Sequence, residues 1–214
     1  MIKFLFGIFV AVLPILSAGA YNDCLNYKIT PRIDIATYEW EKSVSQPDDY
    51  MNEHGHVQTS LIQENGINVK LFSVIGGWCV VLDSVDTKIG YKKFDVKVDK
   101  KYKPNSCFYN AVLAHEDKHI NVHLSVLENH KKALHDTLYG AANSIMPIFI
   151  EDIETVDNVI NDIGHQLNKH PDVVLILQKM NSDLDIQNSK VDLDESGADM
   201  KKCLDEVLDK KKTQ

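Results

Sequence analysis

The sequence predicts one α+β domain, in which an antiparallel β-meander is followed by a long helix and a C-terminal helical region. Apolar side chains alternate with polar ones between Val57 and Asp99, which is the period of a sheet with one buried face. After Pro104 they recur at steps of three, four and seven residues, which is the period of an amphipathic helix. Strands therefore precede helices, and this order is typical of the α+β class.

Length, composition and charge limit the class of protein. The chain has 214 residues, of which 44% are hydrophobic and 25% are charged, which suits one globular domain and excludes a disordered, collagen-like or coiled-coil protein. The formal net charge is -8. Because nucleic-acid backbones require a basic surface, no nucleic-acid partner is expected. We expect a single domain over residues 21–208 and a charged tail at 209–214.

The first twenty residues have the pattern of an export signal. Lys3 gives a short positive region, residues 4–16 are almost wholly apolar, and residues 18–20 are a small-residue cleavage site. We therefore expect a signal peptide at residues 1–20, a periplasmic or secreted location, and no stable membrane insertion after cleavage. An uncleaved membrane anchor is the alternative, but the apolar run is shorter than the roughly 20 residues of a comfortable span.

Export would place the cysteines in a compartment where disulfides persist. The chain contains Cys24, Cys79, Cys107 and Cys203. Their even number predicts two disulfides, for which three connectivities exist. We favour Cys79–Cys107 with Cys24–Cys203, because these would join a strand to the start of the long helix and tie the two termini together. No C-x-x-C pair is present, so a cysteine zinc site is not expected.

The strand region is predicted to be a meander of about four strands. The alternation is clearest at residues 67–71 and 94–98. The Asn-Gly dipeptide at 65–66 is a hairpin signal, and the Gly-Gly pair at 76–77 and Gly90 interrupt the remaining run.

The long helix is predicted to begin at Asn105 or Ser106, since either side chain can cap it. Pro147 forbids its continuation, and Gly140 is a candidate point for a break.

Further helices are predicted towards the C-terminus. A second amphipathic helix is expected over residues 149–167, because its apolar side chains alternate at steps of four and three. Shorter helices are expected at 171–180 and 196–208, and the stretch between them is rich in Asp, Asn and Ser, which predicts a polar loop.

The long helix carries an H-E-x-x-H motif, formed by His115, Glu116 and His119. At about 100° per residue the two histidines are about 40° apart on consecutive turns, so both imidazoles can bind one ion at about 2.1 Å. Glu116, beside them, can hold a water molecule and accept its proton. We therefore expect His115 and His119 to bind one metal ion, with Glu116 beside a water molecule held on that ion.

The third ligand of this metal ion should come from another element. His123 is too far along the helix, because residues eight apart are separated by about 12 Å; for His123 and His130 we expect a supporting role, a substrate-side role or simple packing. Glu154, on the predicted second helix, is the favoured third ligand. The remaining candidates are Asp157, His54 and His56, followed by His165 and His170. The carboxylates could also simply place negative charge near a helix start.

The motif on a helix that follows an antiparallel sheet resembles the zincin superfamily of zinc metallopeptidases. The wider order is similar to a bacterial family described as predicted secreted zinc-dependent proteases: a strand with Trp78-Cys79, a further strand, and then Ser106-Cys107 opening the motif helix. The similarity covers residues 66–127.

The resemblance implies that His115 and His119 are zinc ligands and that Glu116 is the catalytic base. The Gly and third His of the metzincin extension are absent, since Val122 and Ser125 stand at those positions. A gluzincin-like carboxylate is therefore implied as the third ligand.

The sequence thus predicts a secreted zinc-dependent peptidase that acts on a peptide or protein substrate. Candidates for the oxyanion donor are Tyr102, Tyr109, Tyr139 and His123. One alternative is an exported zinc-binding or interaction protein without catalytic activity, in which a fourth protein ligand replaces water. A second alternative is a metal-free secreted adaptor or inhibitor whose histidines form a pH-sensitive stripe.

Overall fold

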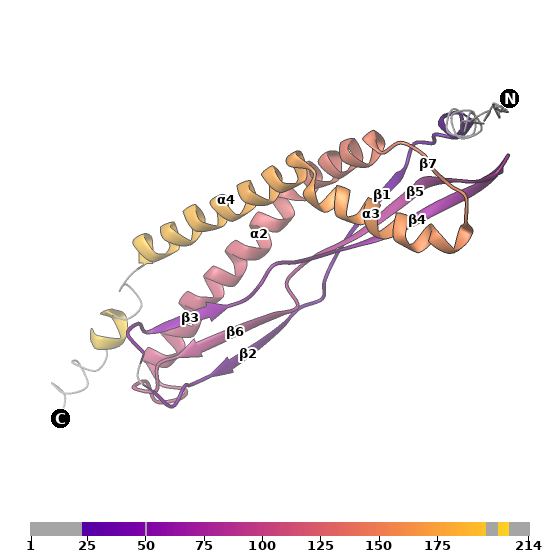
Figure 1. Cartoon of the computed structure of the whole chain (residues 1–214). Helices are drawn as coiled ribbons and strands as arrows, with labels where there is room; N and C mark the ends of the chain where they lie inside the picture. The colour runs from indigo at the N-terminus through magenta and orange to yellow at the C-terminus, as the bar shows by residue number, and fades with distance from the viewer. Residues whose placement is uncertain (1–22, 50, 196–200, 206–214) are drawn as a thin grey trace, which may run out of the picture.

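The structure is a computed structural model that describes residues 23–49, 51–195 and 201–205. It confirms the α+β class, because a β-meander region precedes a long helix and further C-terminal helices. The molecule is elongated, with strands and helices running along one axis (Figure 1). The predicted signal peptide at 1–20 and the charged tail at 209–214 lie outside the described residues.

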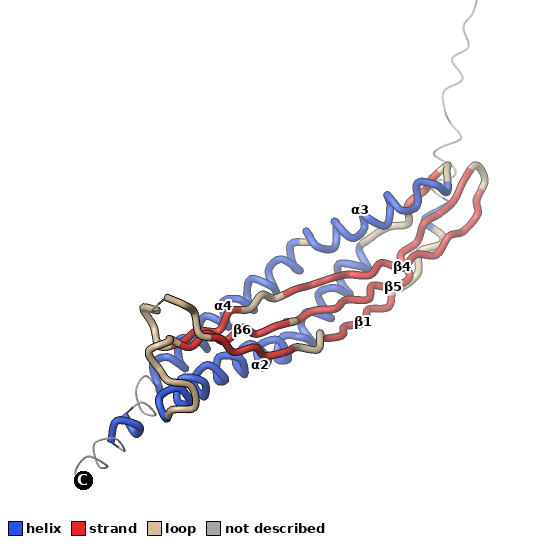
Figure 2. Tube along the Cα trace, turned by 90° about the horizontal axis from the view of Figure 1, so that it is seen from below, coloured by secondary structure: helices blue, strands red, loops and turns tan. Residues whose placement is uncertain are grey.

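Seven strands of the described residues form two sheets that continue one another. In the first sheet the order is β1 (Arg32–Thr37), β5 (Gly77–Gly90) and β4 (Ile62–Val74), and β7 (Ile148–Ile150) also pairs with β5. In the second sheet the order is β2 (Glu41–Ser45), β6 (Lys93–Val98) and β3 (Gly55–Gln58). β1 and β2 pair in parallel with β5 and β6, while β3 and β4 pair antiparallel with β6 and β5. Figure 2 shows the long strands side by side, with α2 running along them.

The hairpin predicted at Asn65-Gly66 is wrong. Gly66 pairs with Asp86 inside the β4–β5 ladder, and the side chain of Asn65 accepts a hydrogen bond from Thr87 at 2.8 Å, so this dipeptide continues the strand. The turn lies instead at Gly76, whose φ of 85° is a left-handed conformation that favours glycine.

The long helix α2 (Cys107–Ser144) lies where it was predicted. Ser106 caps it by accepting a hydrogen bond from the N–H of Tyr109. The helix passes Gly140 without a break and ends before Pro147. Its apolar stripe packs on the sheets, and the buried side chains include Val112, Ile120, Leu127, Leu134 and Leu138.

The C-terminal region differs from the prediction in two places. Residues 149–167 are not one helix: β7 and a short 3-10 helix, η1 (Ile153–Thr155), precede α3 (Val156–Lys169). The predicted polar loop after residue 180 is wrong, because α4 (Pro171–Glu195) is continuous. Most polar side chains of this stretch are exposed while Leu184 is buried. They form the solvated face of a helix, which composition alone cannot distinguish from a loop. Residues 201–205 are helical.

The disulfides are Cys24–Cys79 and Cys107–Cys203, so the favoured pairing was wrong. Cys79 lies near the start of β5, and the chain then runs along β5 and β6 before α2 begins at the other end of the molecule (Figure 1). Bonded cysteines need Cα atoms within about 7 Å, which excludes Cys79–Cys107. The N-terminal segment instead lies beside β5, where Cys24 bonds to Cys79. The helix α4 runs back towards the start of α2, where Cys203 bonds to Cys107.

Two disulfides are compatible with the predicted extracytoplasmic location. Within the described part of the chain, no helix combines the length and the apolar character needed to cross a membrane.

Candidate metal centre

The two motif histidines face each other on consecutive turns of α2. Their Nε2 atoms are 3.2 Å apart, and the rings meet edge to face. The side chains of His115 and His119 are 27% and 14% exposed, so both are half-buried but open to an ion. Burial, and then the neighbouring His119, lower the pKa of His115, which favours the neutral form that binds metals.

Asp192 of α4 brings a third potential ligand atom close to the two histidines, and we call these three atoms the donor triangle. Its Oδ1 lies 3.4 Å from Nε2 of His115 and 3.1 Å from Nε2 of His119. Neighbouring ligand atoms of a tetrahedral site with bonds of about 2.0–2.1 Å are about 3.3–3.4 Å apart, so the triangle fits one divalent ion. Among the described residues, no other group of three His, Cys, Asp or Glu residues could hold a metal, and no fourth joins this one.

Asn188, one turn before Asp192 on α4, orients His119. Its Oδ1 lies 2.9 Å from Nδ1 of His119. Because an amide oxygen only accepts hydrogen bonds, this contact favours the tautomer in which Nδ1 carries the proton and Nε2 keeps its lone pair. A partner of this kind fixes the tautomer of a metal-ligating histidine and raises its basicity.

Glu116 is buried beside the three donors, with 3% of its surface exposed. Burial raises the pKa of Glu116 to about 7. A carboxyl group with such a pKa can take up and release a proton near neutral pH.

His115, His119 and Asp192 line a pocket of about 250 Å³ beside α2. Gly55, His56 and Val57 of β3 form one wall, and Asn188 and Asp192 of α4 form the other. β3 is an edge strand, since within the described residues it pairs only with β6. The pocket therefore places an unpaired strand edge beside the candidate metal centre.

The structure does not bring Glu154, the favoured third ligand, to the two histidines. Glu154 lies exposed in η1, beyond the C-terminal end of α2 and at the other end of the molecule (Figure 1). Asp157 starts α3 in the same region. Asp192 was missed because it falls in the stretch predicted as a loop. Only the continuation of α4 shows that Asn188 and Asp192, four residues apart, share one face.

The other predicted candidates also lie outside the donor triangle. The ring of His54 contacts the hydroxyl of Tyr102. His56 lines the pocket, with Nδ1 2.8 Å from a carboxylate oxygen of Glu53. His165 lies on α3 and His170 follows its last turn.

Two further histidines of α2 have different surroundings. His123 lines the pocket and packs edge-on against Tyr91, with ring centroids 5.0 Å apart, and burial lowers its pKa. It alone of the four proposed oxyanion donors lines the pocket. Nε2 of His130 lies 2.7 Å from Asp183 and links α2 to α4.

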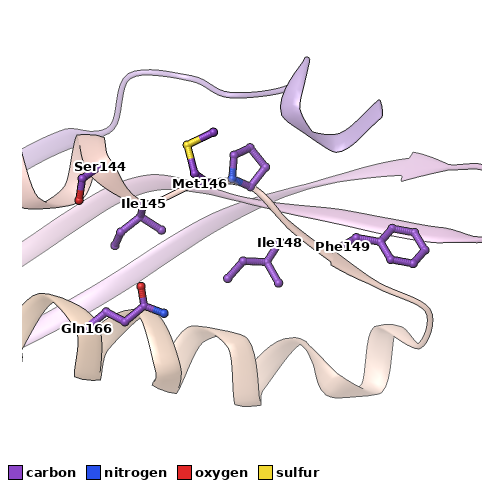
Figure 3. Close-up of a pocket in the computed structure, with 7 residues that line it drawn as sticks. Ser144, Ile145, Met146, Ile148, Phe149 and Gln166 are labelled. Atoms are coloured by element: carbon purple, nitrogen blue, oxygen red, sulfur yellow. The ribbon is translucent and has the colours of Figure 1, made fainter. Parts of the chain in front are cut away.

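A larger pocket of about 580 Å³ lies beyond the C-terminal end of α2 (Figure 3). Its walls are mainly apolar, with Met146, Ile148 and Phe149 beside the polar Ser144 and Gln166. No acidic or imidazole side chain lines it, so it offers neither a metal site nor a general base.

No protein-family model, curated protein or solved structure matches this chain. The inference of function therefore depends on the chemistry of the site.

Proposed function

We propose that this protein is a secreted zinc-dependent peptidase, in which His115, His119 and Asp192 bind the ion and Glu116 is the general base. The observation that carries this proposal is a triangle of donors with sides of 3.1–3.4 Å next to a buried carboxyl group. Two imidazoles and one carboxylate are a known catalytic zinc set, in which the fourth position stays open. Among the described residues only three protein ligands come together. This number favours a catalytic site with an open position over a structural site, in which four protein ligands bind the ion.

Glu116 would act as the proton carrier of the reaction. A zinc ion bound at this site would supply Lewis acidity, which polarises a scissile carbonyl and makes a water molecule acidic. Glu116 accepts the proton of the attacking water and then donates it to the leaving amine, so the amine departs neutral. Asn188 keeps the ring of His119 in the required tautomer during this cycle.

The edge strand β3 supports a peptide as the substrate. An extended peptide can add to an unpaired strand edge through backbone hydrogen bonds. Gly55, His56 and Val57 of β3 line the same pocket as the metal ligands. A peptide bound along this edge would therefore pass the donor triangle and Glu116.

The test combines metal analysis with cleavage of a labelled unfolded protein such as casein. Purified protein should contain one zinc ion per chain, and a chelator should abolish a cleavage that added zinc restores. Glu116→Gln should retain zinc and lower the cleavage rate by about 10²–10⁴-fold. Glu128→Gln, on an exposed part of the same helix, is the control and should leave both unchanged. Equal cleavage by Glu116→Gln and wild type would contradict the proposal.

A further inference from the structure

We propose that the Cys107–Cys203 disulfide is a positioning element of the metal centre. It holds the end of α4 against α2, so that Asp192 reaches the ion and Asn188 reaches His119. This inference depends on the metal site of the proposed function, but it does not require peptidase activity.

The part of α4 that carries the site residues has little packing of its own. Leu184 is its last buried apolar side chain among the described residues. Beyond it, Ile186 is 51% exposed and Leu193 is 80% exposed. A helix end with few apolar contacts opens locally at low cost. Asn188 and Asp192 make polar contacts with α2, and the only apolar side chain between them, Val191, is half-buried, so little apolar packing supports these residues.

The disulfide continues the antiparallel register of α2 and α4. Three successive pairs show this register: His130 with Asp183, His119 with Asp192, and Cys107 with Cys203. From one pair to the next the position moves back 11 and then 12 residues along α2. On the other side it moves forward 9 and then 11 residues. The disulfide thus joins the first turn of α2 to the segment after α4, at the position that the antiparallel register predicts.

A covalent link at this point limits how far the end of α4 can move. The metal centre lies between the buried Leu184 on one side and Cys203 on the other, so Asp192 is held from both directions. Without the bond, ion binding would first have to order the last turns of α4. Ordering on binding reduces the affinity for the ion.

The experiment measures zinc affinity by competition with a chelating dye. Removing the bond with the double variant Cys107→Ser/Cys203→Ser should weaken zinc binding by about 10–100-fold, the usual effect of losing a group that supports a metal ligand. The matched control is Cys24→Ser/Cys79→Ser, which removes the other disulfide at the opposite end of the molecule. It should change the affinity by less than about threefold. Equal affinities in the two double variants would overturn the proposal.

A second comparison tests whether the disulfide acts through Asp192 and Asn188. The double variant Asp192→Ala/Asn188→Leu should weaken zinc binding, and adding Cys107→Ser/Cys203→Ser to it should cause little further loss. Groups that act through the same contacts give such non-additive effects. Fully additive losses would show that the disulfide does not position these two residues and would overturn the proposal.

A third variant keeps both disulfides and thus the covalent frame of the fold. A five-residue Gly-Ser insertion between Glu195 and Lys201 slackens the link and should weaken zinc binding as the serine variant does. Unchanged affinity would overturn the positioning role. Zinc binding that depends on the disulfide, without any peptide cleavage, would support this inference and refute only the peptidase function. A wild-type protein that binds no zinc would overturn both.

Discussion

The backbone of Gly55 lies against the carboxylate of Glu116. A Cβ atom at position 55 would lie 2.9 Å from Oε1 of Glu116, 2.6 Å from Cγ1 of Val112 and 2.9 Å from the carbonyl oxygen of Lys97. Real Cβ atoms essentially never make such short contacts. The absence of a side chain therefore lets β3 approach α2 closely enough to bury Glu116 and form one wall of the pocket.

We expect Gly55→Ala to move either β3 or the carboxylate of Glu116. Overpacking of this kind costs about 1–3 kcal/mol, and displacement of Glu116, the proposed general base, should lower casein cleavage by at least about tenfold. The control is Gly66→Ala on β4, where the new Cβ would lie 3.5 Å from the carbonyl oxygen of Asp86, an ordinary contact. Thermal unfolding and cleavage rates measure both effects. A Gly55→Ala protein that matches the Gly66→Ala protein in both would contradict this account.

The features that depend on local pattern could be predicted from the sequence. The H-E-x-x-H spacing places His115 and His119 on one helix face in any α-helix, and the apolar periods give the strand region and α2. The proposed third ligand could not be predicted, because Asp192 meets the histidines only through the packing of α4 on α2. Gly55 has no local signal either, since its role depends on how closely β3 approaches Glu116.

The disulfide pairing depends on the same long-range arrangement. The two favoured bonds suited a compact meander, whereas β5 and β6 together carry the chain from one end of the molecule to the other. The long continuous strands, which Asn65-Gly66 does not interrupt, therefore decide which cysteines meet.

Asp192 and Glu154 can be compared directly as the third ligand. We expect Asp192→Ala to weaken zinc binding by more than about 10–100-fold, because loss of a ligand should exceed loss of a supporting group. Glu154→Ala should bind zinc as the wild type does, since Glu154 lies in η1 at the other end of α2. Dye competition measures both affinities. The reverse order of the two effects would restore Glu154 as the ligand and exclude Asp192.

Asn188 should act on the metal centre through His119 alone. Asn188→Leu removes the acceptor for Nδ1–H, so we expect zinc affinity to fall by about 10–100-fold. Asn188→Asp keeps an acceptor at this position and should retain most of the affinity. Gln187→Ala, at the neighbouring exposed position of α4, is the control. If Asn188→Leu and Asn188→Asp weaken binding equally, the hydrogen bond to His119 is not what matters.

Asp99 should make the loop before β3 sensitive to acid. Its buried carboxylate accepts hydrogen bonds from the N–H groups of Lys101 (2.8 Å) and Met51 (3.1 Å), and these, above all that of Lys101, hold its pKa below the usual range. Because the folded-state pKa is the lower one, ionised Asp99 stabilises the fold above roughly pH 4, and this stability is lost as the pH falls through the folded pKa. Asp99→Asn should therefore lower the Tm at pH 7, and its difference from wild type should shrink as the pH falls below about 4. Asp49→Asn, an exposed position of the same loop, is the control, and a Tm difference for Asp99→Asn that stays constant from pH 7 to pH 3 would show that charge is not the cause.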